Sequence, residues 1–310
     1  MQSVVSSPPP SPAPAPYNMA QDVLAAGAQT PDKIALQVLR ANGAERWSYA
    51  RLIAAVRGTA TGLSERGLPP GARVLLRLGN SVDFPIAFLG AIAAGLVPVP
   101  TSAQLTRTEI TAMALSLDPA LVLAGDGVAL PDHPAPVLTQ PTLRAMHSLP
   151  PAPWHLGAPD RPGYMVFTSG SSGAPMAVVH AHRALHARRM MWDGWYGLRA
   201  DDRLLHAGAF NWTYTMGTGL MDPWTIGATA LIPEPGAPLA LLLRRFDATL
   251  FAAAPGVYRQ MLKGTDRLDL PRLRHGLSAG EKLPPAMAEA WQRATGTPIF
   301  EALGMSECST

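Results

Sequence analysis

The chain has 310 residues, of which 47% are hydrophobic and 15% charged, and its formal net charge is +3 at pH 7. This composition predicts a globular protein rather than a disordered one, and the length allows one large or two modest domains. Lysines and arginines are scattered without a basic run of five, so nothing in the sequence supports nucleic-acid binding. The single cysteine, Cys308, excludes an internal disulfide and suits a reducing compartment.

The N-terminal tract, residues 1–16, is rich in proline, serine and alanine and lacks the basic and apolar regions of a signal peptide. Such a tract cannot bury enough surface to fold, so we expect a disordered tail and an ordered protein from Tyr17 onward. The longest apolar stretch, residues 84–99, is broken by prolines and glycines and is too short to span a membrane. We therefore expect a cytoplasmic protein with no membrane span.

Short apolar strands alternate with helix-length segments in the first half of the chain. Ser81 is expected to cap one helix, and Thr106 with Glu109 three residues later forms a capping box that starts another. Because strands and helices alternate, the strands are expected to form a parallel sheet covered on both faces. The expected strands are 73–78, 97–99 and 120–124, and the expected helices are 82–94 and 106–117.

The same alternation returns in the second half, after a proline-rich segment at 126–162 that is expected to connect two lobes. We therefore expect one subdomain at 17–125 and a second at 163–310. The expected strands are 164–168, 203–207, 228–232, 248–253, 274–278 and 299–302, and the expected helices are 182–196, 213–224, 239–246, 255–263 and 284–295. The predicted fold is α/β, with two doubly wound, mostly parallel sheets and helices packed on and between them.

Ligands in such sheets bind at the carboxyl ends of strands, which points to the loops Thr168–Gly173, Ser278–Glu281 and Gly304–Glu307. The first loop offers four hydroxyls and two glycines in six positions, a pattern that favours an anion-binding nest. A Ser/Gly-rich turn after a strand is often only a turn, and the common P-loop pattern is absent. Met176 stands where such a loop is expected to carry a cation.

The three loops carry a resemblance to a known family. Tyr164–Pro175 resembles the phosphate loop of the adenylate-forming (AMP-binding) superfamily, which includes acyl- and aryl-CoA ligases such as benzoate–CoA ligase. Ser278–Glu281 resembles its adenine-side loop, and Leu303–Glu307 is similar to its aromatic-Gly-x-Thr-Glu motif. Residues 31–100 also resemble the first lobe of that family. Three motifs in the right order at compatible spacing make the resemblance specific.

The resemblance implies ATP-dependent activation of a small carboxylic acid to an acyl-adenylate, followed by transfer to CoA, the co-substrate of the full-length enzyme. It implies ATP and Mg²⁺ as cofactors and leaves the oligomeric state open. Ser306 is expected at the α-phosphate, and Glu307 as the Mg²⁺ ligand. The residues expected at the β- and γ-phosphates are Thr168, Ser169, Gly170, Ser171, Ser172 and Gly173. Those expected at the rest of the nucleotide are Ala279, Gly280, Glu281, Leu303 and Gly304. Those expected at the acid are Phe210, Asn211, Trp212, Tyr214 and Gly217, with Gly217 and Gly219 leaving open space.

Three departures from the family pattern affect the expected activity. Met176 replaces a lysine, for which Arg183 or an arginine on the following helix is a substitute, and Leu303 replaces an aromatic ring that stacks on adenine. The chain ends three residues after Glu307, before the family's ribose-binding aspartate, hinge and mobile C-terminal domain. The resemblance therefore implies a truncated adenylation lobe, which we expect not to complete thioester formation.

Two alternatives fit the same residues. An acyl-AMP ligase that loads a carrier protein shares these motifs and differs in the region that would follow Thr310. A catalytically inactive relic or nucleotide-binding protein is consistent with Met176, Leu303 and the early end of the sequence.

Overall fold

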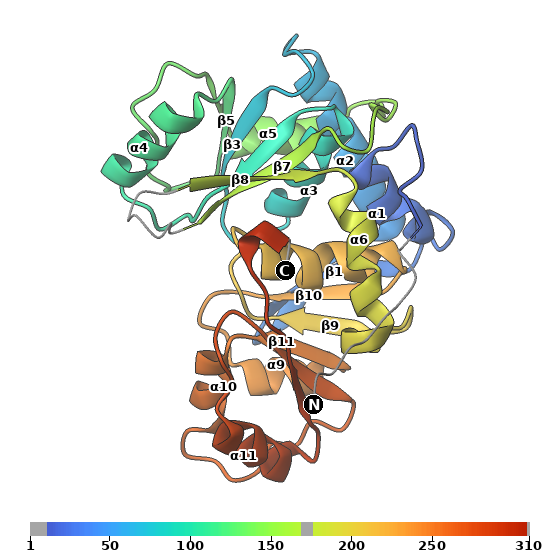
Figure 1. Ribbon diagram of the computed structural model, residues 1–310, viewed down its shortest axis with the longest axis vertical. Coiled ribbons are helices and arrows are strands. Elements are labelled where there is room, and N and C mark those ends of the chain that lie inside the picture. The colour runs from blue at the N-terminus through green and yellow to red at the C-terminus, as the bar shows by residue number, and fades with distance from the viewer. Residues whose placement is uncertain (1–10, 169–175, 309–310) are drawn as a thin grey trace, which may run out of the picture.

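The computed structural model describes residues 11–168 and 176–308, and Figure 1 shows their arrangement. This part of the chain forms a four-stranded sheet in the order β4-β3-β5-β6, a seven-stranded sheet in the order β13-β12-β11-β9-β10-β1-β2, and the hairpin β7-β8. The four-stranded sheet and the hairpin occupy the upper half of Figure 1, and the seven-stranded sheet lies below them. The strands are β1 (Ile34–Arg40), β2 (Gly43–Ser48), β3 (Arg73–Arg77), β4 (Val97–Pro100), β5 (Leu121–Ala124), β6 (Val137–Thr139), β7 (Pro162–Thr168), β8 (Met176–Ala181), β9 (Arg203–His206), β10 (Thr229–Pro233), β11 (Leu250–Ala253), β12 (His275–Ser278) and β13 (Ile299–Glu301).

The predicted α/β fold with mostly parallel sheets is confirmed. Every strand pair of the four-stranded sheet is parallel, and in the seven-stranded sheet only β1 and β2 pair antiparallel. Parallel neighbours need long crossovers, which helices supply. The helices are α1 (Met19–Ala28), α2 (Tyr49–Ser64), α3 (Asp83–Ala93), α4 (Arg107–Leu117), α5 (Gln140–Met146), α6 (Ala184–Arg188), α7 (Thr213–Met216), α8 (Asp222–Thr225), α9 (Leu239–Arg245), α10 (Pro255–Leu262) and α11 (Pro285–Thr295). Three further turns are the π-helical η1 (Trp192–Tyr196) and η2 (Gly217–Met221) and the 3₁₀ turn η3 (Ser306–Cys308).

Local sequence signals explain two of the helices in the first half. The capping box before α4 is confirmed, because Thr106 Oγ1 accepts from the Glu109 N–H and Glu109 Oε2 accepts from the Thr106 N–H at 2.8 Å. The predicted cap at Ser81 is wrong: α3 begins at Asp83, and its capping position is Val82, with no side-chain hydrogen bond. The reason is a tight turn in which the Ser81 N–H donates to the Gly79 carbonyl, so that the helix starts one residue later.

The hairpin β7-β8 corrects the expectation that β7 is a strand of a parallel sheet. β8 pairs antiparallel with β7, so that Thr168 lies opposite Met176 and Tyr164 lies opposite His180. The strand that follows β7 in the described part of the chain is therefore its antiparallel neighbour. The predicted sites Ser169, Gly170, Ser171, Ser172 and Gly173 lie outside the described residues.

The helices predicted at 182–196 and 213–224 are only partly correct. The first is divided into α6 and η1, and the second into α7, η2 and α8. Both interruptions are π-helical, a local widening that is frequent at functional sites. Each widened turn directs a side chain, Tyr196 or Thr218, into one buried polar network that is described below.

Two features of the chain path were not expected from the sequence. β1 pairs in parallel with β10, so that residues from the N-terminal part of the chain join the sheet built mainly from its second half. The proline-rich segment 126–162 contributes β6 and α5, and β6 extends the four-stranded sheet beside β5. Within the described ranges, no helix has the length and apolar character needed to cross a membrane.

Candidate active site

A cavity of about 830 Å³ lies where the carboxyl ends of β3, β4, β9 and β10 meet. Its wall includes residues 78–80 after β3, 102–104 after β4, 207–211 after β9, and 233–240, which begin with the last residue of β10. Carboxyl ends of parallel strands are the usual place for ligands in open α/β sheets, and the volume suits a small organic molecule. Of the residues predicted at the acid, Phe210 and Asn211 line this cavity.

Asn80 fixes the part of the wall that contains Phe210. Its Nδ2 donates to the Gly208 carbonyl at 2.7 Å, and its Oδ1 accepts from the Phe210 N–H at 3.1 Å. The Phe210 ring stacks on Phe84 with centroids 4.8 Å apart, so it belongs to the core as well as to the cavity. Asn80 thereby joins the ends of β3 and β9. We had not predicted this residue, although a polar residue just after an apolar strand is a usable signal.

Arg77, the last residue of β3, holds the neighbouring part of the wall. The side chain is fully buried, and its hydrogen bonds go to the Thr101 hydroxyl and to four backbone carbonyls, those of Ser102, Ala103, Leu105 and Ala129. Burial lowers the pKa of this guanidinium from its ordinary value. The five acceptors lie on two loops, so Arg77 fixes the shape of the segment after β4.

The other predicted acid-site residues lie apart from this cavity wall. Trp212 is 52% exposed, whereas Tyr214 is buried and donates its hydroxyl to the Leu277 carbonyl at 3.0 Å. The expectation of open space at the glycines is wrong. A Cβ on Gly217 would lie 2.2 Å from Cζ of Arg188, and one on Gly219 would lie 2.8 Å from Cβ of His206. Side chains from neighbouring segments fill both places.

The Gly-Met-Ser-Glu motif forms the turn η3, which packs against β8. In Figure 1 this red turn lies between the hairpin and the seven-stranded sheet. His180 of β8 is buried, and its ring stacks on the Tyr164 ring with the two centroids 4.7 Å apart. Burial lowers the pKa of His180; the backbone of Ser306 and the charge of Glu307 oppose that shift, and the charge of Arg188 adds to it. The turn η3, which contains both predicted catalytic residues, therefore packs beside the strand that contains His180.

The predicted adenine-side loop follows β12 and meets the end of β13. The Ala302 N–H donates to the Ser278 carbonyl at 2.9 Å, which joins this loop to the start of the Leu303–Glu307 motif. Ala279 is buried, Glu281 is exposed, and Gly280 has φ +98°, a left-handed conformation that favours glycine. Leu303 is 97% exposed. Two of the three predicted motifs are therefore adjacent.

Glu307 is the carboxylate that the sequence motif assigns to a metal ion. No group of three or more His, Cys, Asp and Glu side chains in the described ranges is arranged to hold an ion. Glu307 is exposed and has no ion pair with another described residue. Because Mg²⁺ in nucleotide sites is held by one or two carboxylates together with phosphate oxygens, this arrangement fits a magnesium–nucleotide complex.

A mostly parallel α/β fold with motif loops at the carboxyl ends of its strands defines a class of ligand-binding α/β proteins. The sequence pattern of one family, described as AMP-binding enzyme, matches residues 23–310, and the chain belongs to that family.

Two curated relatives have aromatic acids in their names. Benzoate–CoA ligase of Thauera aromatica is 32% identical over 305 residues, which cover 91% of this chain and 54% of that protein. The 4-hydroxybenzoate–CoA/benzoate–CoA ligase of Rhodopseudomonas palustris is 32% identical over 285 residues, which cover 84% of this chain and 52% of that protein. The chain thus spans about half the length of the curated relatives it matches.

Solved structures agree on the fold. A benzoate CoA ligase from Burkholderia xenovorans LB400 aligns with a TM-score of 0.81 at 24% identity, covering 95% of this chain and 62% of that one. The anthranilate CoA ligase AuaEII, in complex with anthranoyl-AMP, aligns with a TM-score of 0.84 at 23% identity, covering 95% of this chain and 60% of that chain. These alignments confirm that this chain has the α/β fold of the matched part of those structures.

Proposed function

We propose that this protein activates a carboxylic acid with ATP, as the first half-reaction of an acyl- or aryl-CoA ligase. A carboxylate oxygen of the acid attacks the α-phosphorus of ATP, the bond to the β-phosphate breaks, and pyrophosphate leaves with the acyl-adenylate remaining. The observation that carries the proposal is the packing of the Ser306–Glu307 turn against β8, in a chain of the AMP-binding enzyme family. This packing holds one predicted motif beside β7 and β8, the two strands between which the predicted phosphate loop lies in the sequence.

The substrate supplies the nucleophile, so the protein contributes positioning and charge stabilisation. Glu307 would hold Mg²⁺, which neutralises phosphate charge when it is bound, and Ser306 would donate to the α-phosphate. Thr168, at the end of β7, would begin the set of hydroxyls around the β- and γ-phosphates. The adenine would lie between the Ala279–Glu281 loop and the Leu303–Gly304 segment, which share the edge of β12 and β13.

The acid would lie in the cavity at the carboxyl ends of β3, β4, β9 and β10, against Phe210 and Asn211. An apolar or aromatic acid suits the buried Phe210 ring. The relatives that are named benzoate–CoA and hydroxybenzoate–CoA ligases support an aromatic acid. CoA is the proposed acceptor of the acyl group, as those names indicate for the relatives.

Nucleotide binding without turnover is a second candidate, favoured by two specific residues. Leu303 is 97% exposed and offers adenine no aromatic ring, and Met176 offers the phosphates no charge. Loading of a carrier protein is a variant of the first candidate and shares its adenylation step.

ATP–pyrophosphate exchange with benzoate as the probe acid tests the main proposal on the 310-residue chain. We expect exchange that depends on benzoate and Mg²⁺ and that is lost in the Glu307→Gln variant. Binding of Mg·ATP without exchange with any aryl or medium-chain acid would instead establish the nucleotide-binding candidate. Absence of both exchange and ATP binding would contradict both candidates.

A further inference from the structure

Arg77 is a buried cation without a carboxylate partner. Its side chain is fully buried at the end of β3 and donates to the Thr101 hydroxyl and to four backbone carbonyls. In the part of the chain that the structure describes, it forms no ion pair. Burial of a charge costs free energy, and neutral carbonyls leave the positive charge itself in place. The charge of Arg77 is therefore available to attract an anion.

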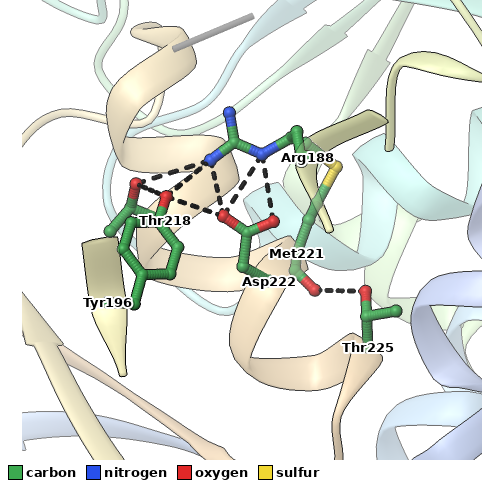
Figure 2. A network of polar contacts seen from close by, with 6 residues as sticks. All are labelled: Arg188, Tyr196, Thr218, Met221, Asp222 and Thr225. Atoms are coloured by element: carbon green, nitrogen blue, oxygen red, sulfur yellow. Dashed lines mark hydrogen bonds and ion pairs between the residues drawn. The ribbon is translucent and has the colours of Figure 1, made fainter. Parts of the chain in front are cut away.

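A second buried arginine, Arg188, shows the usual arrangement, in which a carboxylate neutralises the guanidinium (Figure 2). Arg188 Nε donates to the Asp222 carboxylate at 3.0 and 3.2 Å, and Nη2 donates to Oδ2 of Asp222 at 2.5 Å. Tyr196 donates to the same Oδ2 at 2.9 Å, and the Tyr196 hydroxyl lies 2.6 Å from Thr218 Oγ1. These four side chains form one buried polar network. Arg77 differs from Arg188 because no described carboxylate compensates for its charge.

The guanidinium of Arg77 lies directly behind one wall of the cavity at the carboxyl ends of β3, β4, β9 and β10. The Ser102 and Ala103 carbonyls that accept from it belong to residues that line this cavity. The Ala103 N–H has no hydrogen-bond acceptor among the described residues, so the same wall offers a donor to a ligand. Among the described residues that line the cavity, Glu234 alone has an ionisable side chain, and it is paired with Arg40. The wall in front of Arg77 is therefore electropositive.

The opposite part of the cavity wall is apolar. It includes Leu239 of α9 and Val257 and Met261 of α10, all of which are partly exposed. In Figure 1 α10 lies in the lower half of the molecule and the four-stranded sheet in the upper half. An uncharged ring suits the lower side of the cavity, and a negatively charged group suits the upper side.

The electropositive wall lies on the side of the cavity that is next to the proposed phosphate site. β4 packs against β7, and Leu105, just after this wall, packs against the same buried cluster as Phe167 of β7. Thr168 follows Phe167 and is the proposed first hydroxyl at the phosphates. A carboxylate at residues 102–104 would therefore lie toward the phosphates of ATP.

We propose that Arg77 is a positioning residue for the acid, whose charge draws the carboxylate to the 102–104 wall and leaves the ring against the apolar side chains of α9 and α10. This inference rests on the proposed acid activation. Arg77 does not touch the substrate, because its side chain is fully buried behind the wall. It acts through its charge, so it favours an anionic acid over a neutral molecule of the same shape.

The test compares the binding of benzoate with that of benzamide, a neutral molecule of nearly the same shape, by ligand-observed NMR titration. We expect wild type to bind benzoate about 10-fold more tightly than benzamide. This preference should persist in about 0.5 M NaCl, since a buried charge is screened much less than an exposed one. A wild-type chain that binds both ligands equally, or that loses its preference at high salt, overturns the inference without any variant.

Three variants separate the charge of Arg77 from its structural role. Arg77→Met should abolish the preference for benzoate, whereas Arg77→Lys, which keeps the charge, should retain most of it. The ratio of the two affinities is the readout, because a disordered wall alone weakens both ligands alike. Arg203→Met is the matched control, since Arg203 is a half-buried arginine at the amino end of β9 that donates to the Phe246 carbonyl at 2.7 Å. This control should leave the ratio unchanged.

Thermal unfolding verifies that each variant is folded, and the salt series on wild type decides the question if Arg77→Met is not. An unchanged ratio in folded Arg77→Met, an equal loss of preference in folded Arg77→Lys, or an equal loss in Arg203→Met overturns the inference. A wild-type chain that binds neither ligand and shows no benzoate-dependent exchange contradicts the proposed function instead.

Discussion

Replacing Met176 by lysine should strengthen ATP binding. Met176 is the first residue of β8, lies opposite Thr168 and is 60% exposed, so a lysine fits there without burial of its charge. A hydrogen bond to a charged group contributes about 1.5–3 kcal/mol when it is shielded from water. Exposed pairs are screened to about 0.2–1 kcal/mol. Between these limits we expect about 10-fold tighter binding of Mg·ATP, equivalent to roughly 1.4 kcal/mol.

Isothermal titration of Mg·ATP into wild type and Met176→Lys at low and high salt measures this gain, which should shrink as salt screens the added charge. Met190→Lys is the matched control: Met190 is also 60% exposed but lies after α6, outside the hairpin. Equal ATP affinities for wild type and Met176→Lys, or an equal gain in Met190→Lys, would refute the idea that a cation is missing at this position.

Three further predictions concern metal, pH and packing. Glu307→Gln should weaken ATP binding about 10-fold in the presence of Mg²⁺ but not in its absence. Thermal stability should be unchanged, because the side chain is exposed. A loss of ATP affinity that is independent of Mg²⁺ would argue against metal binding by Glu307. Burial lowers the pKa of His182 to about 3, whereas its pKa in the unfolded chain is about 6.5. Between these two pH values only the unfolded chain binds this proton, so the free energy of unfolding decreases by up to about 1.4 kcal/mol for each unit by which the pH is lowered. Urea unfolding at several pH values should show this slope reduced in His182→Asn, and equal slopes would contradict the assignment. Gly27→Ala should lower the free energy of unfolding in urea by about 1–3 kcal/mol, because the added Cβ would lie 1.9 Å from the Tyr49 ring. Gly43→Ala is the control and should leave the free energy of unfolding nearly unchanged, since no atom lies within 4 Å of its added Cβ. Similar losses in the two variants would refute the packing argument.

The period of the apolar residues and the capping residues were sufficient to predict most elements of this fold. β3, β4 and β5 were predicted from short apolar runs, and the start of α4 from Thr106 and Glu109, because these signals act between residues that are close in sequence. The motif order likewise indicated the family, which the match over residues 23–310 confirms.

The entry of β1 into the second sheet and the division of the helix after His182 were not predictable in this way. The first depends on β10, a partner that is distant in sequence, and the second on a backbone that widens to satisfy a buried network. The predicted role of Gly217 as open space failed for the same reason, since the atom that fills the space belongs to Arg188, 29 positions earlier.

The sequence by itself determined the alternation of strands and helices, the three motif loops and the family, since all of these are written in local composition and spacing. Only the tertiary structure decided that Asn80 and Arg77 shape the cavity wall, that the Ser306–Glu307 turn packs against β8, and that the Arg188–Asp222 pair lies behind Gly217. A buried polar group must find its partner wherever the fold supplies one, and that partner can lie anywhere along the chain.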